Sequence, residues 1–242
     1  IRPDPDLSKS GAWGVIRAYY SAFFAAHSIL RMFGVSCSQL ENSHVAKIYD
    51  SAQILGQADD LKKLESGFYS IKIDPSYSEV TFQKYKDSHR DTWGEFLKLL
   101  NRLLDTSMEV NALTKHKNEV FEILSKIKKG VTRSQCRDKG NWLSVIRNSV
   151  NYQHSHGAWY PYSGQRKAAT YIELLKKEWT KPVSVERALV SSKNDLESFF
   201  EVSALLNSLC RELLVECYEK AGEDSLIFKN GALKLLKTLQ AA

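Results

Sequence analysis

Apolar side chains recur at intervals of three and four residues along most of the chain, which is the period of an α-helix. The first such segment begins after Ser8 or Ser10, either of which can cap a helix, and ends near Phe33, ahead of Gly34. Its apolar positions are Trp13, Ile16, Tyr20, Phe23, His27 and Leu30. Alanines between them are small enough to let a second helix approach closely. We expect a central core helix, and we favour a structural role over a catalytic one for His27.

The same period predicts helices along the rest of the chain. Their ranges are 42–55, 58–64, 91–110, 114–129, 138–156, 165–179, 193–219 and 232–240. Residues 66–82 differ, because Gly67, Pro75 and four serines stand there beside β-favouring residues; they predict a long loop that can hold a short hairpin. The sequence therefore predicts an all-α fold, an up-and-down helical bundle with additional helices and one long loop.

We expect a single helical domain over residues 1–242, with a core at 8–180 and an acidic helical extension at 184–242. Residues 184–224 carry nine acidic and four basic side chains. Within them, the helix predicted at 193–219 places apolar residues at near-heptad spacing, interrupted by Ser203. A helix of this kind can dock a partner, so the segment also suits a subunit of a larger complex.

Length and composition narrow the class of protein. The chain has 242 residues and is 43% hydrophobic, which is enough for a sizeable core. No apolar run approaches the roughly 20 residues of a membrane span, and no secretory signal pattern is visible, so we expect no membrane association. The four cysteines, at positions 37, 136, 210 and 217, form no CxxC pair, which favours a reducing, cytoplasmic setting.

The positive charge is concentrated in one part of the chain. Residues 111–170 contain eleven Lys and Arg against three Asp and Glu, a local net charge of +8, whereas the whole chain carries +6. This asymmetry indicates an anionic partner, nucleic acid first; a solvated, lysine-rich helix end explains it equally well. Trp159 and Tyr160 follow in a turn-forming loop, where they could stack on RNA bases or cover the core. The basic residues that we expect to bind nucleic acid are Lys126, Lys128, Lys129, Arg133, Arg137 and Lys139.

A polar stripe lies along the helix predicted at 138–156. Each residue of a helix advances by about 100°, so Arg147 and His154, seven residues apart, lie about 20° from alignment. Asn151 falls between them on the same side. A cation, an amide and an imidazole in one line suit a phosphate group. His156 would point to the opposite side, so the spacing selects His154 as the partner of Arg147.

Two stretches resemble the HEPN superfamily, named for higher eukaryotes and prokaryotes nucleotide-binding. Residues 18–30, Ala-Tyr-Tyr-Ser-Ala-Phe-Phe-Ala-Ala-His-Ser-Ile-Leu, are similar to the aromatic and alanine-rich first helix of those bundles. The second stretch is Arg147-Asn148 followed by His154. Ribonuclease members of the family carry an arginine, often followed by a polar residue, and then a histidine after four to six residues. Six residues intervene here, and the order of the two stretches also matches the family.

The resemblance implies a metal-independent endoribonuclease in which a ribose 2′-OH attacks the adjacent phosphodiester. His154 would transfer a proton, Arg147 would stabilise the phosphate, and Asn148 or Asn151 would orient either one. The resemblance further implies a homodimer and a bacterial defence or toxin–antitoxin setting, with an antitoxin or a defence-complex subunit as protein partner. It implies no cofactor.

Some HEPN proteins lack catalysis, which leaves an alternative. The chain would then be a non-catalytic helical subunit or a nucleic-acid-binding adaptor, and Arg147 and His154 would be polar residues of a surface or an interface. The six histidines form no HExxH pattern, and the chain contains no glycine-rich phosphate loop. We therefore predict no metal site.

Overall fold

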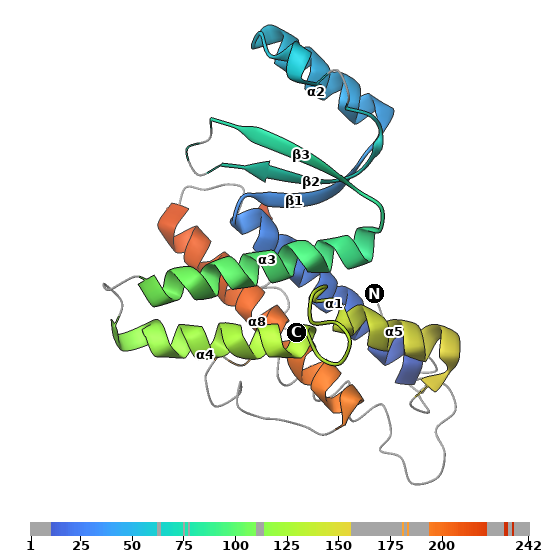
Figure 1. The fold of residues 1–242 in the computed structure, drawn as a ribbon. Helices are drawn as coiled ribbons and strands as arrows, with labels where there is room; N and C mark the ends of the chain where they lie inside the picture. Colours follow the sequence, from blue (N-terminus) through green and yellow to red (C-terminus); the bar gives the residue numbers. More distant parts are fainter. Residues whose placement is uncertain are drawn as a thin grey trace.

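Helices make up most of the chain in the computed structural model (Figure 1). The residues that the structure describes are 11–61, 64–74, 76, 78–109, 114–155, 181, 183, 194–221, 230, 231 and 234. In chain order the elements are α1 (Gly11–Met32), β1 (Val35–Leu40), α2 (Asn42–Ile54), the short 3₁₀ helix η2 (Ala58–Leu61), β2 (Gly67–Ile73), β3 (Val80–Tyr85), α3 (Ser88–Glu109), α4 (Thr114–Val131), α5 (Trp142–Gln153) and α8 (Asp195–Ala221). The helix predicted at 165–179 lies outside the described residues, as does that at 232–240 apart from position 234.

The prediction of a mainly helical protein is confirmed, but the fold is not all-α. Three strands form an antiparallel sheet in the order β1-β2-β3. The sheet begins where α1 ends, because Gly34 adopts a positive φ of 75° that stops the helix. The carbonyl of Gly34 then accepts a hydrogen bond from the amide of Ile73 at 2.9 Å. The residue that ends the first helix thus also starts the pairing of β1 with β2.

The hairpin allowed within the loop predicted at 66–82 is present, but it occupies most of that segment, which forms β2 and the start of β3. Residues 74–79 join the two strands, and the carboxylate of Asp74 accepts the amide hydrogens of Ser76 and Glu79 at 3.1 and 2.7 Å. The serines that suggested a loop are partly strand residues: Ser70 pairs with Cys37 on one side and with Gln83 on the other. Strand pairing with a distant segment outweighs the local preference of such residues.

A buried carboxylate joins the sheet to α3. Glu95 is 3% exposed, and its side chain bonds Lys72 of β2 at 2.9 Å and Lys98 of α3 at 2.7 Å. The hydroxyl of Tyr85 at the end of β3 donates to the same carboxylate. Burial raises the pKa of Glu95. The interactions with Lys98, Tyr85 and Lys72 outweigh this effect and hold the pKa below its usual range. The interaction anchors the sheet above α3 (Figure 1).

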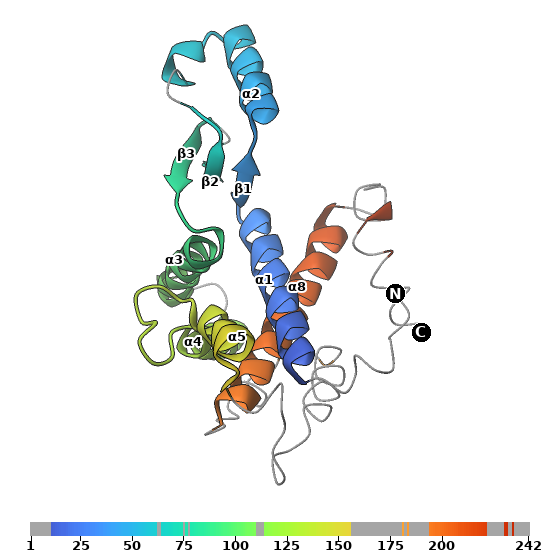
Figure 2. The ribbon, with the colours of Figure 1, turned by 90° about the vertical axis from the view of Figure 1, so that its right-hand side faces the viewer.

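The small residues of α1 form its most buried face. Ala18, Ala22 and Ala26 are fully buried, whereas Trp13 and Tyr20, predicted on the core side, lie at the exposed edge. The reason is close packing, since α8 and α5 both lie against α1 (Figure 2) and its alanines let them approach, while larger side chains such as Leu30 and Ile29 are buried as well. The core-facing stripe of α1 is therefore rotated relative to the one predicted from its largest apolar residues.

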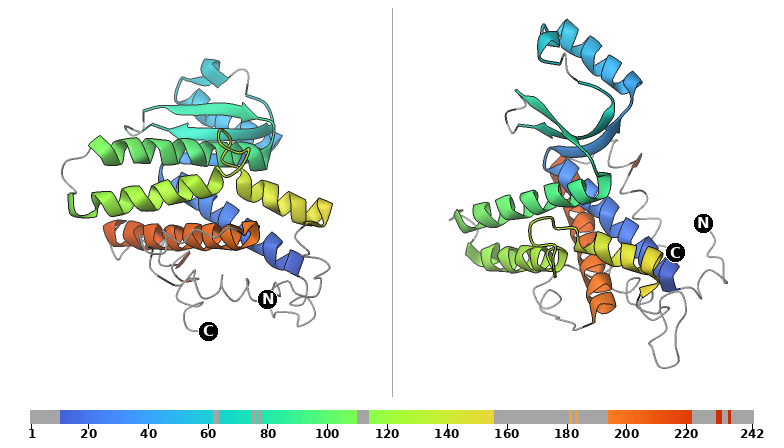
Figure 3. Two further views of the ribbon diagram at one scale, coloured as in Figure 1. Left: turned by 60° about the horizontal axis from the view of Figure 1, so that its bottom comes forward. Right: turned by 45° about the vertical axis from the view of Figure 1, so that its right-hand side comes forward.

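α8 belongs to this helical core. Its buried residues, among them Phe199, Leu206 and Cys210, join the same hydrophobic cluster as α1, α3 and α5. The apolar stripe that suggested a partner-docking helix is thus used inside the fold, with α8 packed against α1 and α4. Figure 3 shows α3, α4 and α8 side by side in the helical body.

α2 lies on the other side of the sheet, away from the helical body (Figures 1 and 2). Ala52 is the one buried residue of this helix, whereas Tyr49 is 37% exposed. Ile54 and Leu55 at its end are 86% and 72% exposed. None of the described helices is long and apolar enough to cross a membrane.

The contact between α4 and α8 generates a stability prediction. A Cβ added at Gly130 would lie 2.5 Å from a methyl carbon of Val202, whereas one added at Gly94 in α3 would meet no atom within 4 Å. Alanine favours a helix over glycine by roughly 0.5–1 kcal/mol at either position. We expect Gly94→Ala to stabilise the protein and Gly130→Ala to destabilise it by about 1–3 kcal/mol, measured by urea unfolding.

Replacing Val202 as well provides the control for this prediction. Gly130→Ala combined with Val202→Ala should unfold less easily than the sum of the two single changes implies, because the collision is removed. An additive double variant would show that Gly130 does not set the distance between α4 and α8.

Candidate functional site

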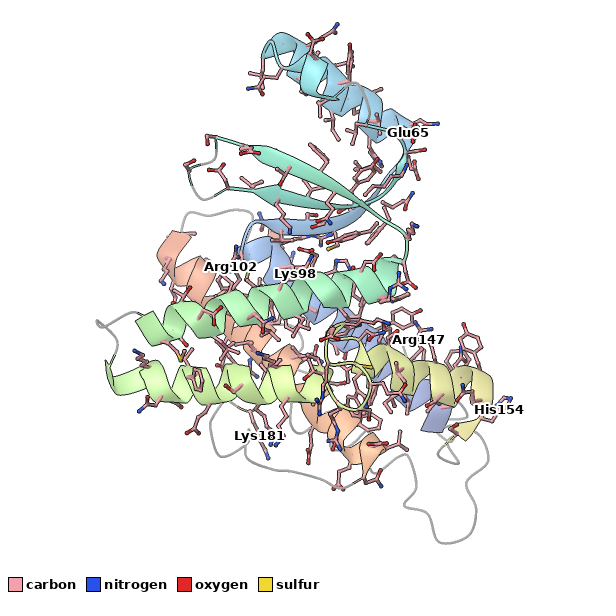
Figure 4. The ribbon with its side chains drawn as sticks, viewed as in Figure 1. Glu65, Lys98, Arg102, Arg147, His154 and Lys181 are labelled. Carbon is pink, nitrogen blue, oxygen red and sulfur yellow. The ribbon has the colours of Figure 1, made fainter. Side chains whose placement is uncertain are left out.

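α5 carries Arg147 into the interface with α1. The helix buries the side formed by Leu143, Ile146 and Val150, and Arg147 lies on this side, four residues after Leu143. Arg147 is 8% exposed. Figure 4 shows it in the first half of α5, where that helix meets the helical body. Arg147 therefore places a cation at a position of α5 where the helical period predicts a buried apolar side chain.

The guanidinium of Arg147 lies over aromatic rings. Its central carbon is 4.7 Å from the ring centre of Tyr19 and 5.9 Å from that of Tyr20. Among the described residues it forms no ion pair, and its buried Nε has no hydrogen-bond partner. Burying a charge without a counter-ion is costly, and cation–π contacts recover only about 0.5–2 kcal/mol of that cost. The arrangement is therefore suited to an anion that comes from outside the protein.

His89 of α3 shares Tyr19 with Arg147. Its Nδ1 lies 2.9 Å from the hydroxyl oxygen of Tyr19, and Trp93 donates its indole N–H to that oxygen at 3.3 Å. Because the indole can only donate, the Tyr19 hydroxyl satisfies both contacts when it donates to Nδ1 of His89. This hydrogen-bond network assigns the proton of neutral His89 to Nε2, leaving an N–H that can bind an acceptor.

Two histidines near this point are held neutral. Burial lowers the pKa of His89, the positive charge of Arg147 lowers it further, and Asp87 opposes them. Burial, followed by the charges of Arg31 and His89, lowers the pKa of His27 to about 4. His27 packs edge-on against Phe23, with ring centres 4.6 Å apart. His89 therefore enters an anion complex uncharged at neutral pH.

The polar stripe predicted along α5 is only partly realised. α5 ends at Gln153, and His154 follows as its C-cap in a left-handed conformation with φ of 51°. His154 is exposed at the far end of the helix from Arg147 (Figure 4). Asn151 is half-buried and Asn148 is exposed. Because the helix ends before His154, helical spacing no longer sets the direction of that side chain.

The predicted basic residues divide into two groups. Arg133 has a structural role, since it lies 5.0 Å over the ring of Trp142, donates to the hydroxyl of Ser198 at 2.6 Å and pairs with Asp195. The others lie in the second half of α4 or in the connector to α5; they are Lys126, Lys128, Lys129, Arg137 and Lys139. Lys129, Arg137 and Lys139 are exposed, which leaves them able to meet an anionic surface.

Three further residues singled out in the sequence, Trp159, Tyr160 and His156, lie outside the described residues. Over the part of the chain that the structure describes, no three His, Cys, Asp or Glu side chains are grouped to hold a metal ion.

Sequence reasoning missed His89, Tyr19 and Trp93 as parts of the site. Tyr19 stood inside the stretch that resembles the HEPN first helix, but nothing in the spacing of the chain connects it to His89 in α3. The feature of the sequence that could have pointed to this site is the aromatic pair Tyr19-Tyr20 inside a helix rich in alanine.

Comparisons of the chain with protein-family models, with curated proteins and with solved structures found no match. The assignment of function therefore depends on the residues of the site.

Replacing Arg147 or Arg31 one at a time should show which arginine lowers the pKa of His89 and which lowers that of His27. We expect Arg147→Gln to raise the pKa of His89, because a positive charge that opposes protonation is removed. Arg31→Gln should instead raise the pKa of His27. Imidazole resonances followed by NMR during a pH titration measure both. An unchanged His89 in Arg147→Gln would contradict the proximity of the two groups.

Proposed function

We propose that the protein is a metal-independent endoribonuclease in which Arg147 binds the phosphate at the cleavage position. The observation that carries the proposal is a guanidinium, 8% exposed, with no ion-pair partner among the described residues. A phosphodiester would supply the missing negative charge. The exposed cations Lys129, Arg137 and Lys139 are suited to holding the rest of an RNA chain. The resemblance to the HEPN superfamily supports the same reaction.

In the reaction, a ribose 2′-OH would attack the adjacent phosphorus and lose its proton to solvent, while the bond to the 5′-oxygen breaks and that oxygen takes up a proton. Arg147 would stabilise the additional negative charge of the crowded phosphate. We assign the proton donor for the leaving 5′-oxygen to His89, which shares Tyr19 with Arg147. The charge of a bound phosphate should raise the pKa of His89 toward its ordinary value, so that an imidazolium forms in the complex.

His154 is the other candidate for proton transfer, and it follows from the family motif. It lies about 10 Å along the helix axis from Arg147, by the helical rise of seven residues. A HEPN-type homodimer would bring the motif helices of two copies together and shorten that separation. The same resemblance supports a bacterial defence or toxin–antitoxin setting.

A non-catalytic subunit is the second candidate function. The exposure of Ile54 and Leu55 at the end of α2 favours it, because two neighbouring aliphatic side chains in water are suited to a protein contact. The two functions differ in one property: a subunit or adaptor would bind RNA or protein without cutting RNA.

Cleavage of labelled single-stranded RNA in the presence of EDTA tests the ribonuclease proposal. We expect cutting by the wild-type chain, with 2′,3′-cyclic phosphate and 5′-hydroxyl ends. Arg147→Gln and His89→Asn should each reduce the rate by about 100-fold or more, because each removes a group that acts in the transition state. His154→Asn should reduce it by less than about tenfold, because His89 supplies the proton.

Arg102→Gln provides the matched control, since Arg102 is an exposed arginine of α3 in a different part of the molecule (Figure 4). It should cut at the wild-type rate, and thermal melts should show all four variants folded. A large loss in His154→Asn with a small loss in His89→Asn would reverse the assignment of the proton donor. Absence of cleavage by the wild-type chain would reject the enzyme in favour of the adaptor.

A further inference from the structure

Two aromatic side chains on α1 continue the site onto the protein surface. Phe24 is 61% exposed and Tyr20 is 38% exposed, one helical turn apart. Their ring centres are 6.2 Å apart, with planes inclined by 28°. A single exposed aromatic residue is common in proteins, but two neighbouring rings form a platform of flat apolar surface.

This platform begins at the buried arginine. Tyr20 is 5.9 Å from the guanidinium of Arg147 and 6.0 Å from the ring of His89, which it meets edge-on. Phe24 extends the row toward His27, at 6.5 Å between ring centres. The groups run in the order Arg147, Tyr20, Phe24, His27, so an anion at Arg147 would have the two rings beside it.

The charges around the platform favour an anionic ligand. α1 contains Arg17 and Arg31 and no Asp or Glu, and α5 contains Arg147 and no Asp or Glu. A nucleic acid carries the opposite charge, and its bases offer the flat surfaces that aromatic rings bind.

We propose that Tyr20 and Phe24 form a base-stacking subsite beside Arg147, which selects single-stranded nucleic acid. The inference rests on the proposed function, because it takes Arg147 as the phosphate site. Bases of a duplex are already stacked on one another and cannot reach the rings, whereas those of a single strand can. Stacking on the rings requires no 2′-OH, and DNA lacks the nucleophile of the cleavage reaction, so a single-stranded DNA would bind the subsite without being cut and would inhibit the cleavage of RNA.

Binding of a fluorescent single-stranded oligothymidylate, followed by anisotropy, tests the subsite without cleavage. Phe24→Leu keeps an apolar side chain and removes the ring, and we expect it to weaken binding by roughly 5- to 150-fold. Tyr49→Leu is the control, because Tyr49 is a ring on α2 that is 37% exposed, close to the 38% of Tyr20, and it should bind as the wild type does. A DNA hairpin duplex should bind Phe24→Leu and wild-type protein equally.

The outcomes separate this inference from the function on which it rests. If the wild-type chain cuts RNA and Phe24→Leu binds the oligothymidylate normally, the subsite is rejected and the ribonuclease stands. If nothing is cut but Phe24→Leu loses binding, the subsite stands on an adaptor. If Phe24→Leu instead converts a dimer into a monomer in analytical ultracentrifugation, the rings belong to an interface between copies, and the subsite is rejected.

Discussion

The close packing of α1 is the constraint on which the rest of the structure depends. Its alanines let α8 and α5 approach, and the side chains that cannot fit between helices are displaced to the edges. Tyr19 is a large ring that is nevertheless fully buried, at the point where α1, α3 and α5 meet. One face of that ring supports Arg147, and its hydroxyl bonds His89 and Trp93. The candidate site is thus an extension of the core and shares its rigidity.

Two buried charges in this protein are surrounded in different ways. Glu95 is satisfied by Lys72, Lys98 and the hydroxyl of Tyr85, so its burial joins the sheet to α3. Arg147 is nearly as buried, but it contacts aromatic rings and has no carboxylate partner among the described residues. A charge held in this way lowers stability unless a ligand neutralises it, and such costs recur where proteins bind or react.

The sheet and α2 form a part of the molecule distinct from the helical body that holds the site. They attach through Gly34 at one end and through Glu95 and Tyr85 at the other. None of their exposed apolar residues belongs to the hydrophobic core or to the candidate site around Arg147. This separation would allow a partner on α2 and a nucleic acid on α1 to bind at the same time.

Local patterns in the sequence determined several features that the structure retains. The helical period located α1, α3, α4 and α8 to within a few residues, and Gly34 marked the end of α1, because these features depend on neighbours three or four residues away. Arg147 was also identified from its helix alone, as the cation of a polar stripe with Asn151 and His154. The charge asymmetry is likewise a property of composition.

Only the tertiary structure decided which groups meet. β1 and β2 pair through hydrogen bonds between two segments that are distant in the sequence, and the β-favouring residues of β2, such as Ile71 and Ile73, do not by themselves identify that partner. The buried side of α1 follows from the closeness of its neighbours, which favours alanine over larger residues that dominate a hydrophobic count. His89 adjoins Arg147 because α3 and α5 both cross α1 at Tyr19, whereas His154 leaves the helix at its C-cap. The spacing of residues along one helix shows only which of them share a face of that helix. Which residue lies beside Arg147 depends on where separate helices cross.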